Sequence, residues 1–189
     1  MRVIAIDGPA GAGKSTVARQ GSTATGLRYL DTGAMYRCVA LAVQQSSTDA
    51  NDAEAVGQIA REVSVVIGRD AAMLNGTDVS AEIRSSEINS IVSIIAAHTP
   101  VRDAMREQQR AWIRDHEGGV VEGRDIGTVV FPDAEIKFYL EATMELRAKR
   151  RFDELFLIDK NITYKEVLEN IKLRDNQDTN RKHSPLKKA

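Results

Sequence analysis

The feature that most constrains this chain is a glycine-rich stretch near its start, Gly8-Pro9-Ala10-Gly11-Ala12-Gly13-Lys14-Ser15-Thr16. It fills every fixed position of the phosphate-loop pattern G-x-x-x-x-G-K-[ST]. The apolar run 3–6 precedes it and predicts a buried strand, and the residues from Thr16 onward can open a helix. Because glycine makes up only about 7% of average sequences, a chance match in one chain is improbable. The stretch therefore predicts a strand, loop and helix that bind a nucleoside triphosphate.

The physical chemistry of such a loop explains the prediction. Backbone N–H groups at a helix N-terminus point at a bound anion, and the helix dipole adds partial positive charge. Lys14 is expected to reach the outer phosphates of ATP, and the Ser15 hydroxyl is expected to bind Mg²⁺. A glycine-rich strand–helix turn with a solvated lysine is the alternative interpretation.

Composition excludes several other classes of protein. The chain has 189 residues and a formal net charge of −1, which gives no overall attraction to nucleic acid or to a membrane. Its one cysteine, Cys38, excludes an internal disulfide, and no apolar run reaches the length of a membrane span. Asp7 and the glycine loop interrupt the first apolar run too early for a signal peptide. We expect a monomeric cytoplasmic protein that acts on small molecules.

A second anion site is predicted after the strand 28–31. That strand turns through Thr32 and Gly33 into a helix that runs from residue 34 to about 45. Thr32 is placed to cap this helix and Arg37 lies one turn in, so a hydroxyl, helix N–H groups and a guanidinium converge. An ordinary cap beside a surface arginine explains this stretch equally well when it is taken alone.

Residues 46 to about 100 predict a small lobe inserted in the main α/β domain. Apolar strands are indicated at 63–67 and 72–74. Asn75-Gly76 then predicts a hairpin turn, and another short strand is indicated at 78–79. A helix with one apolar face follows, and Ser93 lies beside that face.

The strand 119–122 ends in Glu122, and Arg124 and Asp125 follow it. Open α/β sheets bind ligands at the carboxyl ends of their parallel strands. We therefore expect Glu122 to hold a water on Mg²⁺ opposite Ser15, with Arg124 and Asp125 turned towards the cleft. Four parallel strands are predicted in all, at 2–7, 28–31, 119–122 and 134–140.

Two late helices carry clustered arginines. Arg147, Arg150 and Arg151 share one helix face, which beside a phosphate loop indicates a mobile arginine lid rather than a solvated surface. The apolar stripe of the last helix continues at the same spacing into Arg174, Asp178 and Arg181. This predicts arginines aimed at an anion, with Asp178 orienting one of them; fraying into a charged tail is the alternative.

Taken together, five stretches resemble bacterial cytidylate kinase from Val3 to about Leu186: GPAGAGKST, DTGAMYR, VSAEIRSSEIN, TPVR and EGRDIGTVVFP. The resemblance implies a single P-loop kinase domain over residues 1–189, with a three-layer α/β fold and a mostly parallel central sheet. It also implies that the inserted lobe at about 46–100 binds the nucleoside monophosphate and that a helical lid lies at about 143–163. The implied reaction is transfer of the γ-phosphoryl group of ATP to CMP or dCMP, with Mg²⁺.

The resemblance also implies residue roles. The ATP phosphates would be held by residues 8–16, the phosphate of the acceptor by Thr32, Arg37 and Arg124, and the cytosine base by Ser93, Arg102 and Asp125. Arg102 would donate to the O2 and N3 side of the base and Asp125 would accept from its amine, which leaves uracil unpaired. Lys14 and Arg124 would act on the transferred group with lid residues Arg150 and Arg151. Arg174 and Arg181 would be further clamps on the phosphates or on the acceptor nucleotide, and Asp178 would belong to the substrate-binding residues.

The chain departs from the family in two ways. Gly21 and Thr25 stand where relatives carry apolar residues in the first helix. The sequence also stops at Ala189, before the family's last strand and closing helix, so we expect that edge strand and C-terminal helix to be missing and an apolar sheet edge to be exposed. Two other functions remain open: a kinase for another monophosphate or small acceptor, and a nucleotide-binding module without catalysis.

Overall fold

The structure is a computed structural model that describes residues 1–68, 70–157 and 159–189. Its strands are β1 (Arg2–Asp7), β2 (Tyr29–Asp31), β3 (Val65–Ile67), β4 (Ala72–Leu74), β5 (Thr77–Asp78), β6 (Gly118–Gly123) and β7 (Ile136–Tyr139). Its α-helices are α1 (Lys14–Thr25), α2 (Thr32–Gln45), α3 (Ala53–Glu62), α4 (Ser86–Ile95), α5 (Thr99–Asp115), α6 (Met144–Phe156) and α7 (Tyr164–Asn180). A 3₁₀ turn, Glu82–Arg84, and a π-helical turn, Ile126–Val130, complete the elements.

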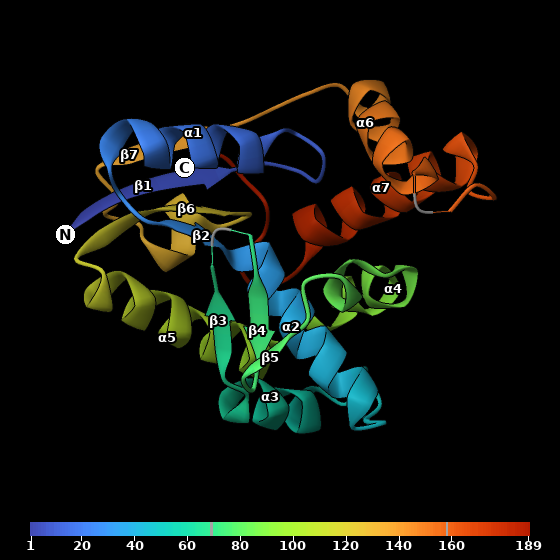
Figure 1. Cartoon of the computed structure of the whole chain (residues 1–189), viewed down its shortest axis with the longest axis horizontal. Coiled ribbons are helices and arrows are strands. Elements are labelled where there is room, and N and C mark those ends of the chain that lie inside the picture. Colours follow the sequence, from blue (N-terminus) through green and yellow to red (C-terminus); the bar gives the residue numbers. More distant parts are fainter. Residues whose placement is uncertain (69, 158) are drawn as a thin grey trace.

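The main sheet has the strand order β2-β6-β1-β7, and every pair in it is parallel. Alternate residues of β1 face opposite sides: Ile4 and Ile6 pack with Ala18 of α1, whereas Val3 and Ala5 join the larger core of α2 and α5. Both faces of a parallel sheet need such cover, because its strands are apolar throughout. Figure 1 shows α1 above the sheet and α2 and α5 below it. The predicted three-layer α/β fold is confirmed.

The edge strand β7 differs from the other three strands of this sheet. Ile136 and Phe138 lie two positions apart on the same face of β7, and 44% and 50% of their surface is exposed. The sheet has four strands in the described part of the chain, and the apolar edge expected from the sequence is present.

A second, antiparallel sheet is formed by β3, β4 and β5. Asn75 and Gly76 both adopt positive φ, 49° and 83°, as the predicted hairpin turn requires. This sheet packs against α2 and lies on the other side of that helix from α4 (Figure 1). The bounds predicted for the lobe and the lid each include one residue outside the described ones, 69 and 158, and these bounds remain a prediction.

The helices α6 and α7 pack on each other and carry their own small core of Ala148, Val167 and Ile171. Thr163 and Glu166 form the expected capping box at the start of α7. Figure 1 shows this helix pair at one end of the molecule, with α7 returning towards the sheet. Among the described helices, none combines the length and apolar character that crossing a membrane would need.

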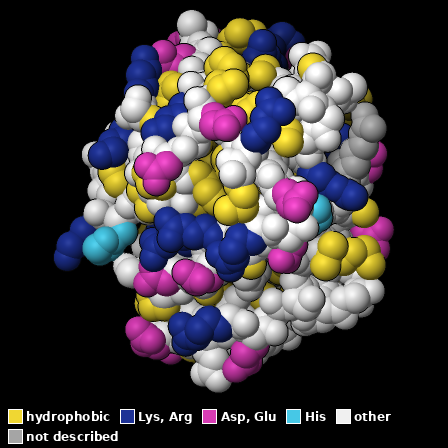
Figure 2. All heavy atoms as spheres, turned by 90° about the vertical axis from the view of Figure 1, so that its left-hand side faces the viewer, with side chains coloured by type: hydrophobic (Ala, Val, Ile, Leu, Met, Phe, Trp, Pro, Cys, Tyr) yellow, Lys and Arg dark blue, Asp and Glu magenta, His cyan; other side chains and the backbone are white. Residues whose placement is uncertain are grey.

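The outer surface mixes both signs of charge. On the face drawn in Figure 2, basic and acidic side chains lie next to one another, with apolar patches between them. This distribution agrees with the net charge of −1 and contrasts with the cleft described below.

Candidate active site

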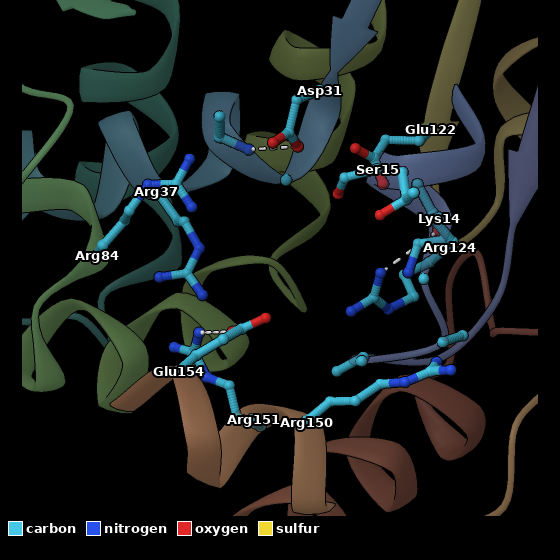
Figure 3. A pocket seen from close by; sticks show the side chains of 18 of the residues that line it. Lys14, Ser15, Asp31, Arg37, Arg84, Glu122, Arg124, Arg150, Arg151 and Glu154 are labelled. Carbon is cyan, nitrogen blue, oxygen red and sulfur yellow. Dashed lines mark hydrogen bonds and ion pairs between the residues drawn. The ribbon is translucent and has the colours of Figure 1, made fainter. Parts of the chain in front are cut away.

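A cleft of about 760 Å³ opens where β1, β2 and β6 end, as predicted for a sheet of parallel strands. Of the described residues that line it, seven carry basic side chains and three carry acidic ones. The basic ones are Lys14, Arg37, Arg84, Arg124, Arg150, Arg151 and Arg174, and the acidic ones are Asp31, Glu122 and Glu154. Figure 3 shows all of them except Arg174, which it does not label, around one open space, with the glycine loop on one side and Arg37 and Arg84 on the other. The sequence did not predict Asp31, Arg84 or Glu154 here.

The glycine loop connects β1 to α1, and its residues 10–16 line the cleft. Gly8 has φ 148°, and a Cβ there would collide with the backbone carbonyl of Leu140. Gly13 has φ 93° and turns the chain into α1, whose N-terminus therefore faces the cleft. Both glycines adopt conformations that other residues rarely reach, which explains the motif physically.

Lys14 is buried at the start of α1, and its Nζ donates to the carbonyl oxygen of Pro9 at 2.8 Å. Burial lowers the pKa of this ammonium to about 7, and the nearby Arg124 adds to the shift. The Lys14 side chain therefore turns back to the backbone of its own loop, in a buried environment that disfavours its charged form. An anion in the cleft would remove that disadvantage.

Oxygen atoms gather where Ser15, Asp31 and Glu122 meet (Figure 3). The Glu122 carboxylate accepts a hydrogen bond from the Tyr29 hydroxyl, which sequence reasoning missed. Burial raises the pKa of the Glu122 carboxyl above its usual range, and the neighbouring Asp31 raises it further. Hard oxygen donors with adjacent like charges fit a divalent cation such as Mg²⁺, which keeps several waters and uses one or two carboxylates.

The prediction that Thr32 caps α2 is wrong. The Asp31 carboxylate accepts from the backbone N–H of Ala34 at 3.0 Å and occupies the cap, because it lies one residue earlier with an equally suitable oxygen. The Thr32 hydroxyl is buried and donates to the carbonyl of Glu122 at 2.6 Å. Thr32 does not line the cleft, and its contact with an acceptor phosphate remains a prediction.

Arg37 does line the cleft. Its Nη1 donates to the Ile83 carbonyl at 2.9 Å and its Nη2 to the Asn89 side-chain oxygen at 2.7 Å. Burial lowers its pKa to about 9, and the guanidinium groups of Arg174 and Arg151 contribute to the shift. Arg37 thus belongs to a group of cations that repel one another.

The sequence predicts that Asp178 orients Arg174 or Arg181, but its shortest contact in the structure is with Arg124, which follows β6. Its Oδ2 accepts from Arg124 Nε at 2.9 Å, and its Oδ1 lies 3.5 Å from Arg181 Nη1. Arg181 follows the last residue of α7 rather than continuing its stripe. Arg174 remains on α7, where burial and Arg124 lower its pKa to about 10, and its Nε has no hydrogen-bond partner within the described residues.

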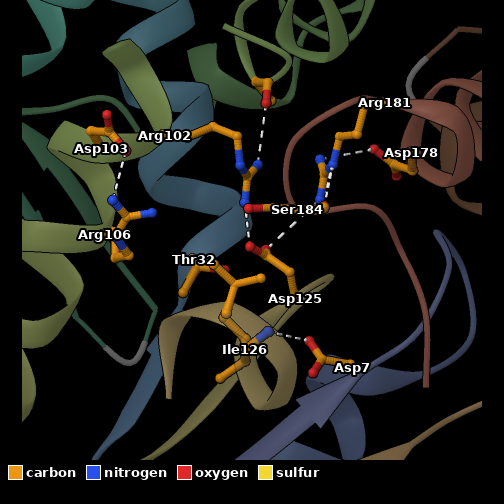
Figure 4. Close-up of polar contacts among 12 residues, drawn as sticks. Asp7, Thr32, Arg102, Asp103, Arg106, Asp125, Ile126, Asp178, Arg181 and Ser184 are labelled. Atoms are coloured by element: carbon orange, nitrogen blue, oxygen red, sulfur yellow. Dashed lines mark hydrogen bonds and ion pairs between the residues drawn. The ribbon is translucent and has the colours of Figure 1, made fainter. Parts of the chain in front are cut away.

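The predicted base-reading residues Arg102 and Asp125 form a buried ion pair (Figure 4). Arg102 also donates to the carbonyl of Ala96 at 3.1 Å, and Arg181 Nη2 lies 3.7 Å from the free side of Asp125. Ser93 is half-buried on α4, one turn before Ala96. This group adjoins the cleft through Arg124, the residue before Asp125, and does not itself line it.

Two residues that sequence reasoning missed hold the segment after Asp125. The Asp7 carboxylate accepts from the backbone N–H groups of Ile126 and Gly127, each at 2.8 Å. Arg110 donates to the carbonyls of Val130 and Val129 at 3.0 and 3.2 Å. The turn that carries Asp125 is therefore fixed to β1 at one end and to α5 at the other.

The three arginines assigned to one lid face separate in the structure. Arg150 and Arg151 line the cleft, and Arg151 donates to Glu154 at 3.0 Å (Figure 3). Arg147 is instead buried, and it donates to the carbonyl of Ala10 at 3.1 Å and to Asp175 at 2.6 Å. It ties α6 to the glycine loop and α7, so its predicted place with the other two is wrong.

Known proteins resemble this chain over nearly its whole length. The sequence matches the family described as cytidylate kinase over residues 4–189. A cytidylate kinase of Caldanaerobacter subterraneus subsp. tengcongensis is 46% identical over 97% of this chain and 81% of the relative. Cytidylate kinases of Thermosipho melanesiensis and of Geobacter sp. strain M21 are 46% and 43% identical, over 98% and 99% of this chain and 84% and 82% of their own lengths. The crystal structure of TT1252 from Thermus thermophilus aligns with a TM-score of 0.47 at 19% identity, over 97% of this chain and 85% of that one. By its family match and its relatives, the chain belongs to the cytidylate kinase family.

Proposed function

We propose that this kinase transfers the γ-phosphoryl group of ATP to CMP or dCMP, giving ADP and CDP or dCDP. The excess of basic over acidic side chains in one cleft, beside a phosphate loop, carries the proposal. Such a cleft is suited to two nucleotides that meet through their phosphates, whose mutual repulsion must be offset.

On the donor side, the loop from Gly8 to Thr16 would hold the ATP phosphates through backbone N–H groups and the N-terminus of α1. Lys14 would exchange the Pro9 carbonyl for phosphate oxygens. Ser15, and Glu122 through a water, would hold Mg²⁺, which when bound neutralises charge on the phosphates.

On the acceptor side, Arg37 and Arg124 would hold the phosphate of CMP, with the Thr32 hydroxyl beneath it. The lowered pKa values of Arg37 and Arg174 support this assignment, because crowded guanidinium groups gain most from a nearby dianion.

The protein needs no general base, since the acceptor is a phosphate oxygen that is already a nucleophile. Its work is to align the two phosphates and to neutralise charge in the transition state. Arg150 and Arg151 from α6 and Arg174 and Arg181 from the α7 region would complete the charge neutralisation. Closure of α6 would exclude water that otherwise hydrolyses ATP.

The base would be selected by exchange of partners in the Arg102–Asp125 pair. Cytosine offers an exocyclic amine to Asp125 and accepts from Arg102 on its O2 and N3 side, with Ser93 nearby. Uracil would place a carbonyl against the carboxylate, and buried groups left unpaired give strong discrimination. We also propose that the enzyme acts as a cytoplasmic monomer in pyrimidine metabolism, on free nucleotides rather than on nucleic acid or membranes.

A coupled assay of ADP release with CMP, dCMP, UMP, AMP and no acceptor tests the proposal. CMP and dCMP should exceed UMP and AMP in kcat/KM by at least about 100-fold. Arg124→Ala should reduce turnover with CMP well beyond twofold. Faster turnover with another acceptor would assign a different substrate, and ATP binding without any acceptor-dependent ADP release would indicate a binding module.

A further inference from the structure

Asn89 is a residue of α4 that contacts arginines from two distant parts of the chain. Its side-chain oxygen accepts from Arg37 Nη2 at 2.7 Å and from Arg151 Nη2 at 3.4 Å. Its Nδ2 donates to the carbonyl of Arg84 at 3.4 Å. One carboxamide therefore connects Arg37 of α2 to Arg151 of α6, and both of these arginines line the cleft.

The chemistry of this contact is specific to a neutral acceptor. Arg37 and Arg151 repel each other, so holding both in place requires an oxygen between them. An amide oxygen accepts from both guanidinium groups without cancelling their charge. A carboxylate in the same place would pair with them more strongly and would compete with an incoming phosphate.

The other hydrogen bonds of Arg37 and Arg151 do not link the two arginines to each other. Arg37 is held by the Ile83 carbonyl at 2.9 Å and Arg151 by Glu154 at 3.0 Å, within its own helix. Within the described residues, Asn89 is the hydrogen-bond acceptor that the two arginines share. Its loss would leave each with one local partner and would leave their separation unspecified.

We propose that Asn89 is a positioning residue for phosphoryl transfer, which sets the acceptor-side arginine Arg37 and the lid arginine Arg151 at a fixed separation and couples α6 to the acceptor site. The inference rests on the proposed function for its kinetic consequence and on geometry for the link itself. Asn89 is half-buried, so it can be replaced without opening the main core.

The kinetic experiment compares Asn89→Ala and Asn89→Asp with a matched control on the same helix, Ser90→Ala. Asn89→Ala should lower kcat/KM for CMP roughly 5- to 20-fold, as expected for hydrogen bonds to charged groups, while the Kd for ATP alone stays within about twofold. Asn89→Asp should lower it further than Asn89→Ala, because its charge competes with the phosphate. Ser90→Ala should match wild type in all these values, and all three variants should keep the wild-type melting temperature within a few degrees.

A measurement that does not depend on catalysis tests the link separately. Backbone hydrogen exchange of residues 150–156 in the ligand-free protein should be faster in Asn89→Ala than in wild type or in Ser90→Ala. If the wild type shows no CMP-dependent turnover, the proposed function fails, and unchanged exchange in Asn89→Ala then overturns the link. With an active wild type, an unchanged kcat/KM for CMP in Asn89→Ala, or Asn89→Asp equal to or better than Asn89→Ala, overturns the positioning role.

Discussion

The phosphate cleft and the Arg102–Asp125 pair are neighbours with opposite electrostatic states. The cleft keeps its basic side chains in excess over its acidic ones, and Lys14, Arg37 and Arg174 have lowered pKa values. In the buried pair next to it, Arg102 and Asp125 are each other's counter-ions, and the adjoining Arg181 and Asp178 add one charge of each sign. The cleft is therefore arranged to gain from any polyanion, whereas the pair gains only from a ligand that replaces both halves of its contact. We therefore propose that the cleft provides affinity for phosphates and that the pair provides selectivity for the base.

The largest expected effect comes from removing the cation in the glycine loop. Lys14→Met should lower kcat with CMP by about 10³-fold or more, because the transferred phosphoryl group loses charge stabilisation. The folded state should not lose stability near pH 7, since a buried ammonium with a lowered pKa is removed. Steady-state kinetics measures the expected loss of kcat, and thermal melting measures the stability. A kcat within tenfold of wild type would contradict the role of Lys14.

The second largest expected effect comes from breaking the ion pair between Arg102 and Asp125. Asp125→Asn should lower kcat/KM for CMP by about 100-fold and narrow the preference for CMP over UMP by at least about tenfold, because an amide can donate to the uracil carbonyl. It should also lower the melting temperature, since Arg102 keeps a buried charge without its counter-ion. The same panel of acceptors measures both, and an unchanged CMP-to-UMP ratio would remove Asp125 from base selection.

The third prediction is a pH effect that belongs to the cleft alone. In the ligand-free protein, Lys14 has a pKa of about 7, and bound phosphates should raise this pKa. ATP binding above pH 7 should therefore be accompanied by uptake of a proton. ATP affinity should fall as pH rises from about 7 towards 10, by at most about tenfold per pH unit. Titration calorimetry in two buffers of different ionisation enthalpy measures the proton uptake, and Lys14→Met should abolish it.

The smallest expected effect separates the two regions directly. At physiological ionic strength, interactions between exposed charges more than about 8 Å apart are largely screened, and added salt shortens this distance, whereas buried pairs are screened much less. The KM for CMP should therefore rise severalfold between low salt and about 0.5 M KCl, while the ratio of kcat/KM for CMP and UMP stays within about twofold. A ratio that moves as strongly as the KM would show that base selection also depends on solvent-exposed charge.

The sequence predicted features that depend on local residues better than features that depend on distant ones. The glycine loop was predictable because its φ angles and its position before a helix are encoded in nine consecutive residues. The cap of α2 was assigned to Thr32 because two adjacent oxygens compete for the same N–H, and spacing does not decide between them. Helical spacing placed Arg147 with Arg150 and Arg151, but it does not say which arginine is covered by a neighbouring element.

Long-range contacts were out of reach for a different reason. Asp7 holds residues Ile126 and Gly127, which lie 119 and 120 positions further along the chain, and no local pattern indicates such a partner. No local pattern indicates the hydrogen bond from the Tyr29 hydroxyl to Glu122 either. That Arg102 and Asp125 lie close together followed only from the family resemblance, which placed both at the base, and their ion pair was not predicted. Their separation of 23 residues carries no periodic signal, because one lies on a helix and the other after a strand.

The mutual dependence of Arg102 and Asp125 also bears on how such an enzyme changes over generations. Replacing Asp125 alone leaves Arg102 buried without its counter-ion, and the loss is about 3–5 kcal/mol, a large share of a small domain's stability. A lineage that drifts towards another nucleobase must therefore alter both positions nearly together or first acquire stabilising changes elsewhere. With the pair selecting the base as proposed, the choice of base should evolve more slowly than the strength with which phosphates are bound.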